Sequence, residues 1–161
     1  MTRIYLGLGS NINPEKHIPA GIESLKTLFS AVQVSPIYLS PAFGFDGDDF
    51  HNLVVIAETD LSAEQVIGQL RDLEFQHGRP QNAEKYSSRT LDIDLLMYGD
   101  FVGEVCGYQI PRKDIYKFDF VLRPLADLAP EESAPDGSET FAELWSVMAD
   151  ASELQEVSVA E

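Results

Sequence analysis

The chain has 161 residues, of which 44% are hydrophobic, and a formal charge of -16. This hydrophobic share is enough for a core and excludes a disordered chain. The longest apolar runs, such as LVVIA and LLMY, fall far short of the roughly 20 residues that a membrane helix needs, so no membrane association is expected. We expect one domain over residues 1–161, with an acidic tail from about residue 150.

The charge is unevenly distributed along the chain. Residues 131–161 contain nine acidic residues and no Lys or Arg, whereas eight of the 11 basic residues lie between positions 71 and 123. An acidic protein is a poor candidate for binding a nucleic-acid backbone. A local group of cations within it indicates a small polyanion such as a nucleotide. Surface charges that balance nearby acids explain the same pattern equally well.

The location of the protein is inferred from its cysteine content and its first residues. Cys106 is the only cysteine, which excludes an internal disulfide and fits a reducing compartment. The opening residues, MTRIYLGLGSN, enter a strand-like pattern at once and lack the architecture of a signal peptide. We therefore expect a cytoplasmic protein, and we expect it to act as a monomer.

The first part of the chain combines strand and helix patterns. Residues 3–8 predict a strand, and a helix begins at Pro14, because proline is favoured in the first turn. Residues 31–38 look extended, with Pro36 indicating a sheet edge or a bulge. Residues 52–59, NLVVIAET, predict the next strand.

The second part of the chain completes the order of elements. Ser62 and Gln65 predict a capping box that opens a helix, and residues 89–100, RTLDIDLLMYGD, alternate cleanly as a strand does. The order strand, helix, strand, strand, helix, strand is the split β-α-β pattern. We therefore predict an α+β, ferredoxin-like α/β sandwich with a mainly antiparallel sheet and helices packed on it. Further helices are expected within residues 118–128 and around residues 141–148.

Asp92 and Asp94 are the sharpest local feature. Strand side chains alternate between faces, so these two carboxylates point the same way while Leu91, Ile93 and Leu95 point into the core. Paired hard oxygen ligands suit Mg²⁺, which is often held by one or two carboxylates plus substrate phosphates. Two such ions can bridge a polyphosphate. An ordinary solvated strand face is the alternative, since D-x-D pairs are common.

Basic residues near Asp92 and Asp94 strengthen the prediction of a site for metal-bound phosphates. Arg89 lies three residues before Asp92, where a guanidinium is suited to bidentate phosphate binding, although a salt bridge to Asp92 or Asp94 is the alternative. Arg79 and Lys85 lie in the preceding polar loop. A basic loop of this kind can close over phosphates, unless its cations serve only solubility.

Aromatic residues form a second group. Phe43, Phe50, Tyr86 and Phe120 lie in or beside loops near the same elements, where exposed rings can stack on a planar heterocycle. Asn52, at the start of an apolar strand, needs partners for its amide, and a flat ligand with amide-like edges would supply them. Rings that belong to the core and an asparagine that caps the backbone are the alternatives.

Several motifs, in order along the chain, resemble those of the 6-hydroxymethyl-7,8-dihydropterin pyrophosphokinase family, whose enzyme precedes dihydropteroate synthase in folate synthesis. The most specific is RTLDIDLL, and the resemblance covers about residues 3–137. The other motifs are LGLGSN, SPIYLSPAFG, FHNLVVIAET, LEFQHGR, IPRKD and FVLRPLADLAP.

The resemblance implies a ferredoxin-like fold and a reaction in which pyrophosphate passes from ATP to the pterin hydroxymethyl group and AMP leaves. It implies that Asp92 and Asp94 hold two Mg²⁺ ions, and that Arg79 and Arg89 are catalytic with them. The implied pterin-binding residues are Ser40, Pro41, Phe43, Phe50, Asn52, Tyr86 and Phe120. The implied ATP-binding residues are Arg71, Glu74, Lys85, Arg89, Arg112 and Lys113. Small molecules are thus the expected partners, with no nucleic acid.

Departures from the family pattern fall mostly on the nucleotide side. Arg112 and Lys113 stand where the family commonly has histidine and tyrosine, Phe118 replaces a family arginine, and Arg71 stands where a glutamine often meets the nucleotide. Two alternatives to the active enzyme follow. One is a non-catalytic or weakly active relative that binds a pterin or nucleotide. The other is a different two-metal enzyme on a similar sandwich.

Overall fold

The computed structural model describes residues 1–42, 45–78, 89–152 and 154–157. Four of the expected site residues, Phe43, Arg79, Lys85 and Tyr86, lie outside these ranges. Within the described part of the chain, every helix is too short or too polar to serve as a membrane span.

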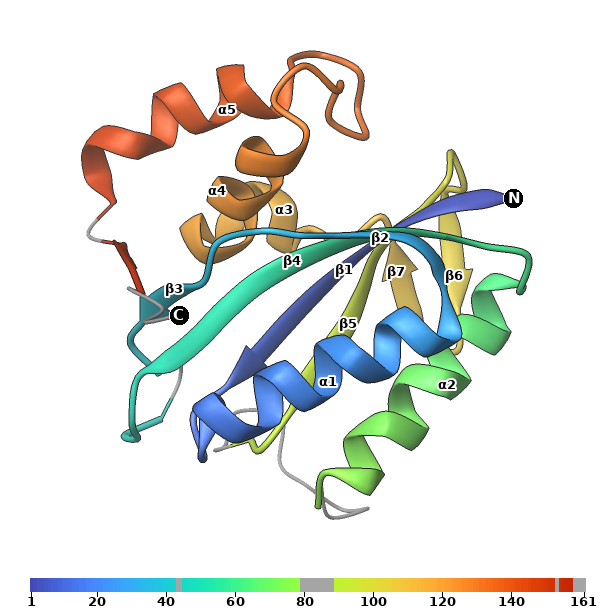
Figure 1. Cartoon of the computed structure of the whole chain (residues 1–161). Helices are drawn as coiled ribbons and strands as arrows, with labels where there is room; N and C mark the ends of the chain where they lie inside the picture. The colour runs from blue at the N-terminus through green and yellow to red at the C-terminus, as the bar shows by residue number, and fades with distance from the viewer. Residues whose placement is uncertain (43–44, 79–88, 153, 158–161) are drawn as a thin grey trace.

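A six-stranded sheet forms the centre of the molecule (Figure 1). Its order is β5-β1-β4-β3-β8, with β2 also paired to β4, and every pairing is antiparallel. The strands are β1 (Thr2–Ser10), β2 (Ser30–Val34), β3 (Tyr38–Ser40), β4 (Phe50–Thr59), β5 (Asp92–Tyr98) and β8 (Gln155–Glu156). The predicted α+β sandwich with a mainly antiparallel sheet is confirmed.

Helices cover both faces of this sheet (Figure 1). On one face lie the two long helices α1 (Pro14–Leu28) and α2 (Ala63–Gln76). On the other face lie α3 (Asp114–Lys117), α4 (Asp119–Leu128) and α5 (Phe141–Met148), which is followed by the 3-10 turn η1 (Ala149–Ala151). A separate hairpin, β6 (Gly103–Val105) and β7 (Tyr108–Ile110), lies beyond β5.

The side chains of the central strand β1 alternate between the two faces of the sheet, and this decides which helices each of them packs against. Ile4, Leu6 and Leu8 are buried with the apolar stripes of α1 and α2. Tyr5 points the other way and is buried with Leu122 of α4. Gly7 and Gly9 continue the Tyr5 face, and there they leave the sheet surface without side chains, because alternate residues share a face.

A bulge in the sheet shifts the end of β5. Tyr5 pairs with Met97 while its neighbour Leu6 pairs with Leu95, so Leu96 is an extra residue in β5. Leu96 and Met97 are therefore both buried on the α4 face. Before the bulge the alternation is regular, and Ile93 and Leu95 lie in the α1–α2 layer.

The predicted elements agree with the structure except in details. The capping box of Ser62 and Gln65 is present at the start of α2, and the last helix covers residues 141–148 as expected. The extended segment 31–38 is divided between β2 and β3 at Pro36. The hairpin β6–β7 and the helix α3 were not predicted, because three- and four-residue elements carry too little periodicity.

Candidate active site

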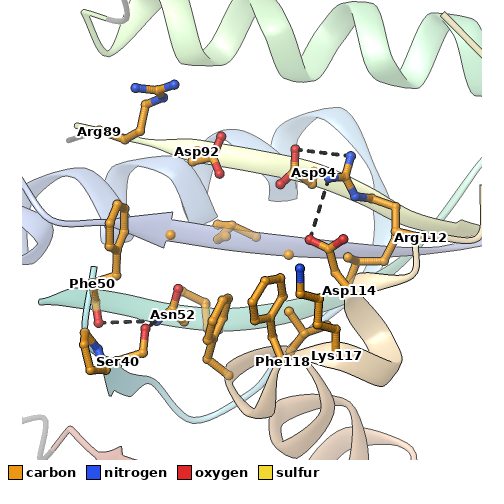
Figure 2. Close-up of a pocket in the computed structure, with 18 of the residues that line it drawn as sticks. Ser40, Phe50, Asn52, Arg89, Asp92, Asp94, Arg112, Asp114, Lys117 and Phe118 are labelled. Carbon is orange, nitrogen blue, oxygen red and sulfur yellow. Dashed lines mark hydrogen bonds and ion pairs between the residues drawn. The ribbon is translucent and has the colours of Figure 1, made fainter. Parts of the chain in front are cut away.

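A cavity of about 600 Å³ opens on the α4 face of the sheet (Figure 2). Gly7 and Gly9 of β1 are among its lining residues. Strands β1, β4 and β5 form its base, and the segment from β7 to α4 forms its side. The polar and aromatic residues lining it are Ser40, Phe45, Phe50, Asn52, Arg71, Arg89, Asp92, Asp94, Tyr108, Arg112, Asp114, Lys117, Phe118 and Phe120.

The two glycines separate the side chains of β4 from those of β5 at the base of the cavity. Gly9 pairs with Asn52 of β4 on one side and with Asp92 of β5 on the other. Gly7 pairs in the same way with Val54 and Asp94. The cavity therefore runs across a strand that carries no side chains there, from an amide on β4 to two carboxylates on β5.

The β4 end of the cavity is aromatic and carries one fixed amide. Asn52 is only 6% exposed, and its Nδ2 donates to Ser40 Oγ at 2.6 Å and to the Phe50 carbonyl at 3.3 Å. Phe118 and Phe120 stack with their ring centroids 4.8 Å apart. A buried, oriented amide beside flat rings is suited to the hydrogen-bonding edge of a planar heterocycle.

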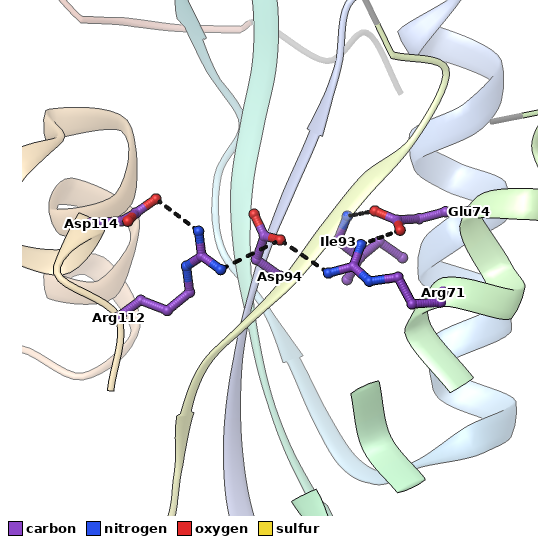
Figure 3. Close-up of polar contacts among 6 residues, drawn as sticks. All are labelled: Arg71, Glu74, Ile93, Asp94, Arg112 and Asp114. Carbon is purple, nitrogen blue, oxygen red and sulfur yellow. Dashed lines mark hydrogen bonds and ion pairs between the residues drawn. The ribbon is translucent and has the colours of Figure 1, made fainter. Parts of the chain in front are cut away.

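The β5 end is built around Asp94, which lies between two arginines (Figure 3). Its Oδ1 is 3.5 Å from Arg71 Nη2 and 4.0 Å from Arg112 Nη1. Arg71 reaches this face from α2 past β5, which is the edge strand of the sheet. It is oriented by an ion pair with Glu74, which also accepts the edge N–H of Ile93 at 2.9 Å.

The environment of Asp94 disfavours its ionised form. Burial raises the pKa of its carboxyl to about 6, and the negative charge of Asp92 acts in the same direction. Arg112 and Arg71 lower the pKa but do not cancel these effects. A carboxylate held in this state is stabilised by a cation that brings its own negative counter-charge, as a metal ion bound to a phosphate group does.

The donor set fits Mg²⁺ held jointly with a substrate. Asp92 and Asp94 both face the cavity, and the described residues contain no group of three or more His, Cys, Asp or Glu that could hold a metal. Two carboxylates are too few for a cage made of protein alone, but Mg²⁺ typically takes one or two carboxylates and completes its shell with water and phosphate oxygens.

The balance of charge in the cavity differs from that of the protein. Among the described lining residues, four are cationic (Arg71, Arg89, Arg112 and Lys117) and three are acidic (Asp92, Asp94 and Asp114). The whole chain carries a formal charge of -16. Cations gathered in one cleft of an acidic protein favour a small polyanion over an extended one.

Arg89 owes its position to Asn11, at the end of β1. Arg89 lines the cavity and is 6% exposed, so its backbone groups need partners within the protein. Its N–H donates to Asn11 Oδ1 at 2.8 Å, and its carbonyl accepts from the Asn11 N–H at 3.0 Å. Asn11 Nδ2 also donates to the Asp48 carbonyl, which ties in the loop before β4.

Comparison with known proteins decides the family. The family model described as 7,8-dihydro-6-hydroxymethylpterin-pyrophosphokinase (HPPK) matches residues 5–130. The chain belongs to the HPPK family.

Individual members of the HPPK family are similar over most of the chain. The 2-amino-4-hydroxy-6-hydroxymethyldihydropteridine pyrophosphokinase of Pseudomonas aeruginosa is 34% identical over 139 residues, covering 84% of this chain and 85% of its own. The enzyme of the same name from Aquifex aeolicus is 32% identical over 137 residues, covering 84% and 85%. This chain is thus a member of a family of pyrophosphokinase enzymes.

Solved structures share the fold. A crystal structure described as HPPK-DHPS in complex with substrates superposes with a TM-score of 0.74 at 10% identity, covering 93% of this chain and 44% of that one. A second, from Plasmodium falciparum, gives a TM-score of 0.71 at 12% identity, covering 93% and 44%. The chain therefore spans less than half the length of these solved chains, and at this identity the likeness shows the fold alone.

The structure brings most of the expected HPPK site residues to one cavity. Those that line it are Ser40, Pro41, Phe50, Asn52, Arg71, Arg89, Asp92, Asp94, Arg112 and Phe120. Among the described residues, two that were expected to bind ATP do not line the cavity. Glu74 is fully buried behind Arg71, and Lys113 is exposed.

Some lining residues were not assigned by sequence reasoning. Tyr108, Asp114 and Lys117 come from the short elements around α3, and Phe45 comes from the loop before β4. Phe118 was noted only as the replacement of a family arginine. The IPRKD motif lies between Tyr108 and Lys117, so treating it as the centre of a site segment would have found three of them.

Proposed function

We propose that this chain transfers pyrophosphate from ATP to the hydroxymethyl group of 6-hydroxymethyl-7,8-dihydropterin, in folate biosynthesis, and releases AMP. The observation that carries the proposal is the row Asn52, Gly9, Asp92 across the sheet. It joins an end suited to a flat heterocycle with an end suited to a metal-bound polyphosphate. Two substrates that react with each other must meet in one cavity of this kind.

The pterin occupies the β4 end in this proposal. Phe50 and Phe120 flank its ring, and Asn52, fixed by Ser40, binds its amide edge. Because the amide is already oriented before binding, less conformational entropy is lost when the ligand arrives. Phe43 and Tyr86 belong to this set by family resemblance alone.

The triphosphate occupies the β5 end. Asp92 and Asp94 would hold two Mg²⁺ ions, which neutralise charge on the phosphates when they are bound. Arg89, Arg71, Arg112 and Lys117 surround the same space and supply cationic donors. Arg79, Lys85, Glu74 and Lys113 complete the proposed set on the strength of the resemblance.

The reaction is a displacement at the β-phosphorus of ATP. The pterin hydroxymethyl oxygen forms a bond to that phosphorus, the bond to the bridging oxygen on the α-phosphate breaks, and AMP leaves with that oxygen. The hydroxyl proton is released. Transfer of this type depends on positioning and charge neutralisation more than on covalent help from the protein.

An AMP-release assay tests this function directly. We expect AMP from ATP only when both Mg²⁺ and the hydroxymethyl pterin are present, and we expect Asp92→Asn to lower turnover by about a hundredfold or more. Glu64→Gln, an exposed change on α2, is the control. Pterin-independent AMP release, or full turnover in Asp92→Asn, would remove the assignment.

A non-catalytic relative that binds a pterin or a nucleotide is the second candidate. The observation that favours it is the pairing of Asp94 with two arginines, which occupies a proposed metal ligand. Calorimetry with the pterin, run beside the AMP-release assay, separates the two candidates. Pterin binding without any AMP at high protein concentration supports the second.

A further inference from the structure

Two guanidinium groups share one carboxylate at the β5 end of the cavity (Figure 3). Arg71 comes from α2 and Arg112 from the residue after the cis peptide bond Ile110–Pro111, and both approach Oδ1 of Asp94. Both also lie over the Tyr108 ring, 5.1 and 5.7 Å from its centroid. We call Arg71 and Arg112 the arginine pair.

Each arginine is also anchored away from Asp94. Arg71 forms an ion pair with the fully buried Glu74, and its buried Nε has no hydrogen-bond partner among the described residues. Arg112 lies 3.7 Å from Asp114, and its backbone N–H donates to the Leu96 carbonyl. The two positive charges therefore stay beside Asp94 even when its own charge is taken up by another cation.

We propose that the arginine pair holds Asp94 until a nucleotide arrives, so that a divalent cation binds at Asp94 only together with a polyphosphate. A divalent ion at Asp94 without a nucleotide meets the two guanidinium charges at close range, and they offset part of its attraction to Asp92 and Asp94. A triphosphate reverses this balance, because its oxygens accept hydrogen bonds from the freed guanidinium donors while the ion takes the carboxylate. The inference rests on the proposed function. It adds that Asp94 exchanges the arginine pair for a divalent cation when the polyphosphate binds.

Removal of one arginine is expected to have opposite effects on the two ligands. Without nucleotide, Arg112→Gln should tighten Mn²⁺ binding by about tenfold or more. The reason is that the variant removes the Coulomb repulsion between a divalent ion and a nearby unit positive charge, which corresponds to about a tenfold change in affinity even at the dielectric constant of water. The same change should weaken a metal-free ATP analogue with a methylene group between the α- and β-phosphorus by about tenfold. A substitution that only loosens the fold would weaken both.

The affinity for Mn²⁺ is measured by electron paramagnetic resonance without nucleotide. The affinity for the ATP analogue is measured separately, by calorimetry in the presence of EDTA. Lys26→Gln on α1 is the control, because it removes one positive charge at an exposed position outside the cavity. Arg71→Gln strands the buried Glu74, so Arg71→Gln is combined with Glu74→Gln, whose amide still accepts from Ile93.

The result that overturns the inference is Mn²⁺ binding in Arg112→Gln that is no tighter than in Lys26→Gln. Unchanged affinity for the analogue in both arginine variants would overturn it as well. Neither measurement involves turnover or a pterin. Opposite shifts in a protein that releases no AMP would therefore support the inference while the proposed activity fails.

Discussion

Asn52 and Asp92 are both paired with Gly9, from opposite sides of the central strand β1. Adjacent strands lie about 4.8 Å apart, so the two residues are separated by about 10 Å, with no side chain between them. This distance suits a bicyclic ring next to a phosphate group. The spacing of the proposed substrates is thus set by sheet geometry, which is rigid, and by a residue without a Cβ.

Gly9→Val should separate the two ends of the cavity. A Cβ at Gly9 would lie 3.2 Å from Asn52 Oδ1 and 3.6 Å from the Phe50 ring, so the amide must move. We expect pterin affinity to fall roughly tenfold to a hundredfold, because small displacements of positioned groups carry large effects. Gly7→Ala is the control, since the three atoms nearest to its Cβ all belong to the flexible Leu96 side chain, at 3.5–3.6 Å, and calorimetry with the pterin compares the two variants. Equal affinity in the two variants would contradict this use of Gly9.

Asn11→Ala should affect turnover through the position of Arg89. It removes the acceptor of a buried Arg89 N–H and the donor to the Asp48 carbonyl, which should lower the free energy of unfolding by about 1–3 kcal/mol. Measured well below Tm, kcat should also fall. Asn11→Asp keeps an oxygen acceptor for the Arg89 N–H, loses the donor to the Asp48 carbonyl and adds a negative charge, so it should recover part of kcat. If both variants lose kcat equally, the contact between Asn11 and Arg89 does not explain the loss of kcat.

Asp94→Asn should stabilise the metal-free protein at neutral pH. The pKa of Asp94 is raised in the folded state from its ordinary value of 3.8 to about 6, so the folded protein binds the proton more tightly than the unfolded chain does. Ionisation of Asp94 therefore lowers stability as the pH rises from about 4 to about 6, and this cost persists at pH 7. We expect a Tm several degrees higher than wild type at pH 7 in EDTA, and no difference near pH 4.

The control for this prediction is Asp72→Asn, which changes an exposed carboxylate on α2. Its Tm should follow wild type at both pH values. A lower Tm for Asp94→Asn at pH 7 would show that the arginine pair depends on the Asp94 charge more strongly than burial opposes it.

His77 should make the protein less stable in acid. Its Nδ1 lies 2.8 Å from Nδ1 of His17, so only one of the two nitrogens can carry the proton between them. Burial lowers the pKa of His77 below its ordinary value of 6.5, and His17 and Lys16 add to the effect. The unfolded chain then takes up the proton first, so stability falls as the pH drops below 6.5. His77→Gln should show a flatter dependence of Tm on pH, whereas His51→Gln should keep the wild-type slope.

Local patterns in the sequence were sufficient for the larger elements and for the central pair of acids. Asp92 and Asp94 share a face because strand side chains alternate, and this holds wherever the strand lies. The capping box at Ser62 is likewise a contact between residues three positions apart. Motif order along the chain then indicated the family, which the comparisons confirm.

Only the tertiary structure decided which charges meet Asp94. Arg71, Asp94 and Arg112 come from a helix, an edge strand and the end of a hairpin, and no periodicity relates them. Glu74 and Lys113 have the residue types of a nucleotide site, yet one is fully buried and the other faces solvent. A sequence pattern fixes the direction of a side chain relative to its own strand or helix, whereas the partners of a charge depend on how separate elements pack, and these contacts are long-range.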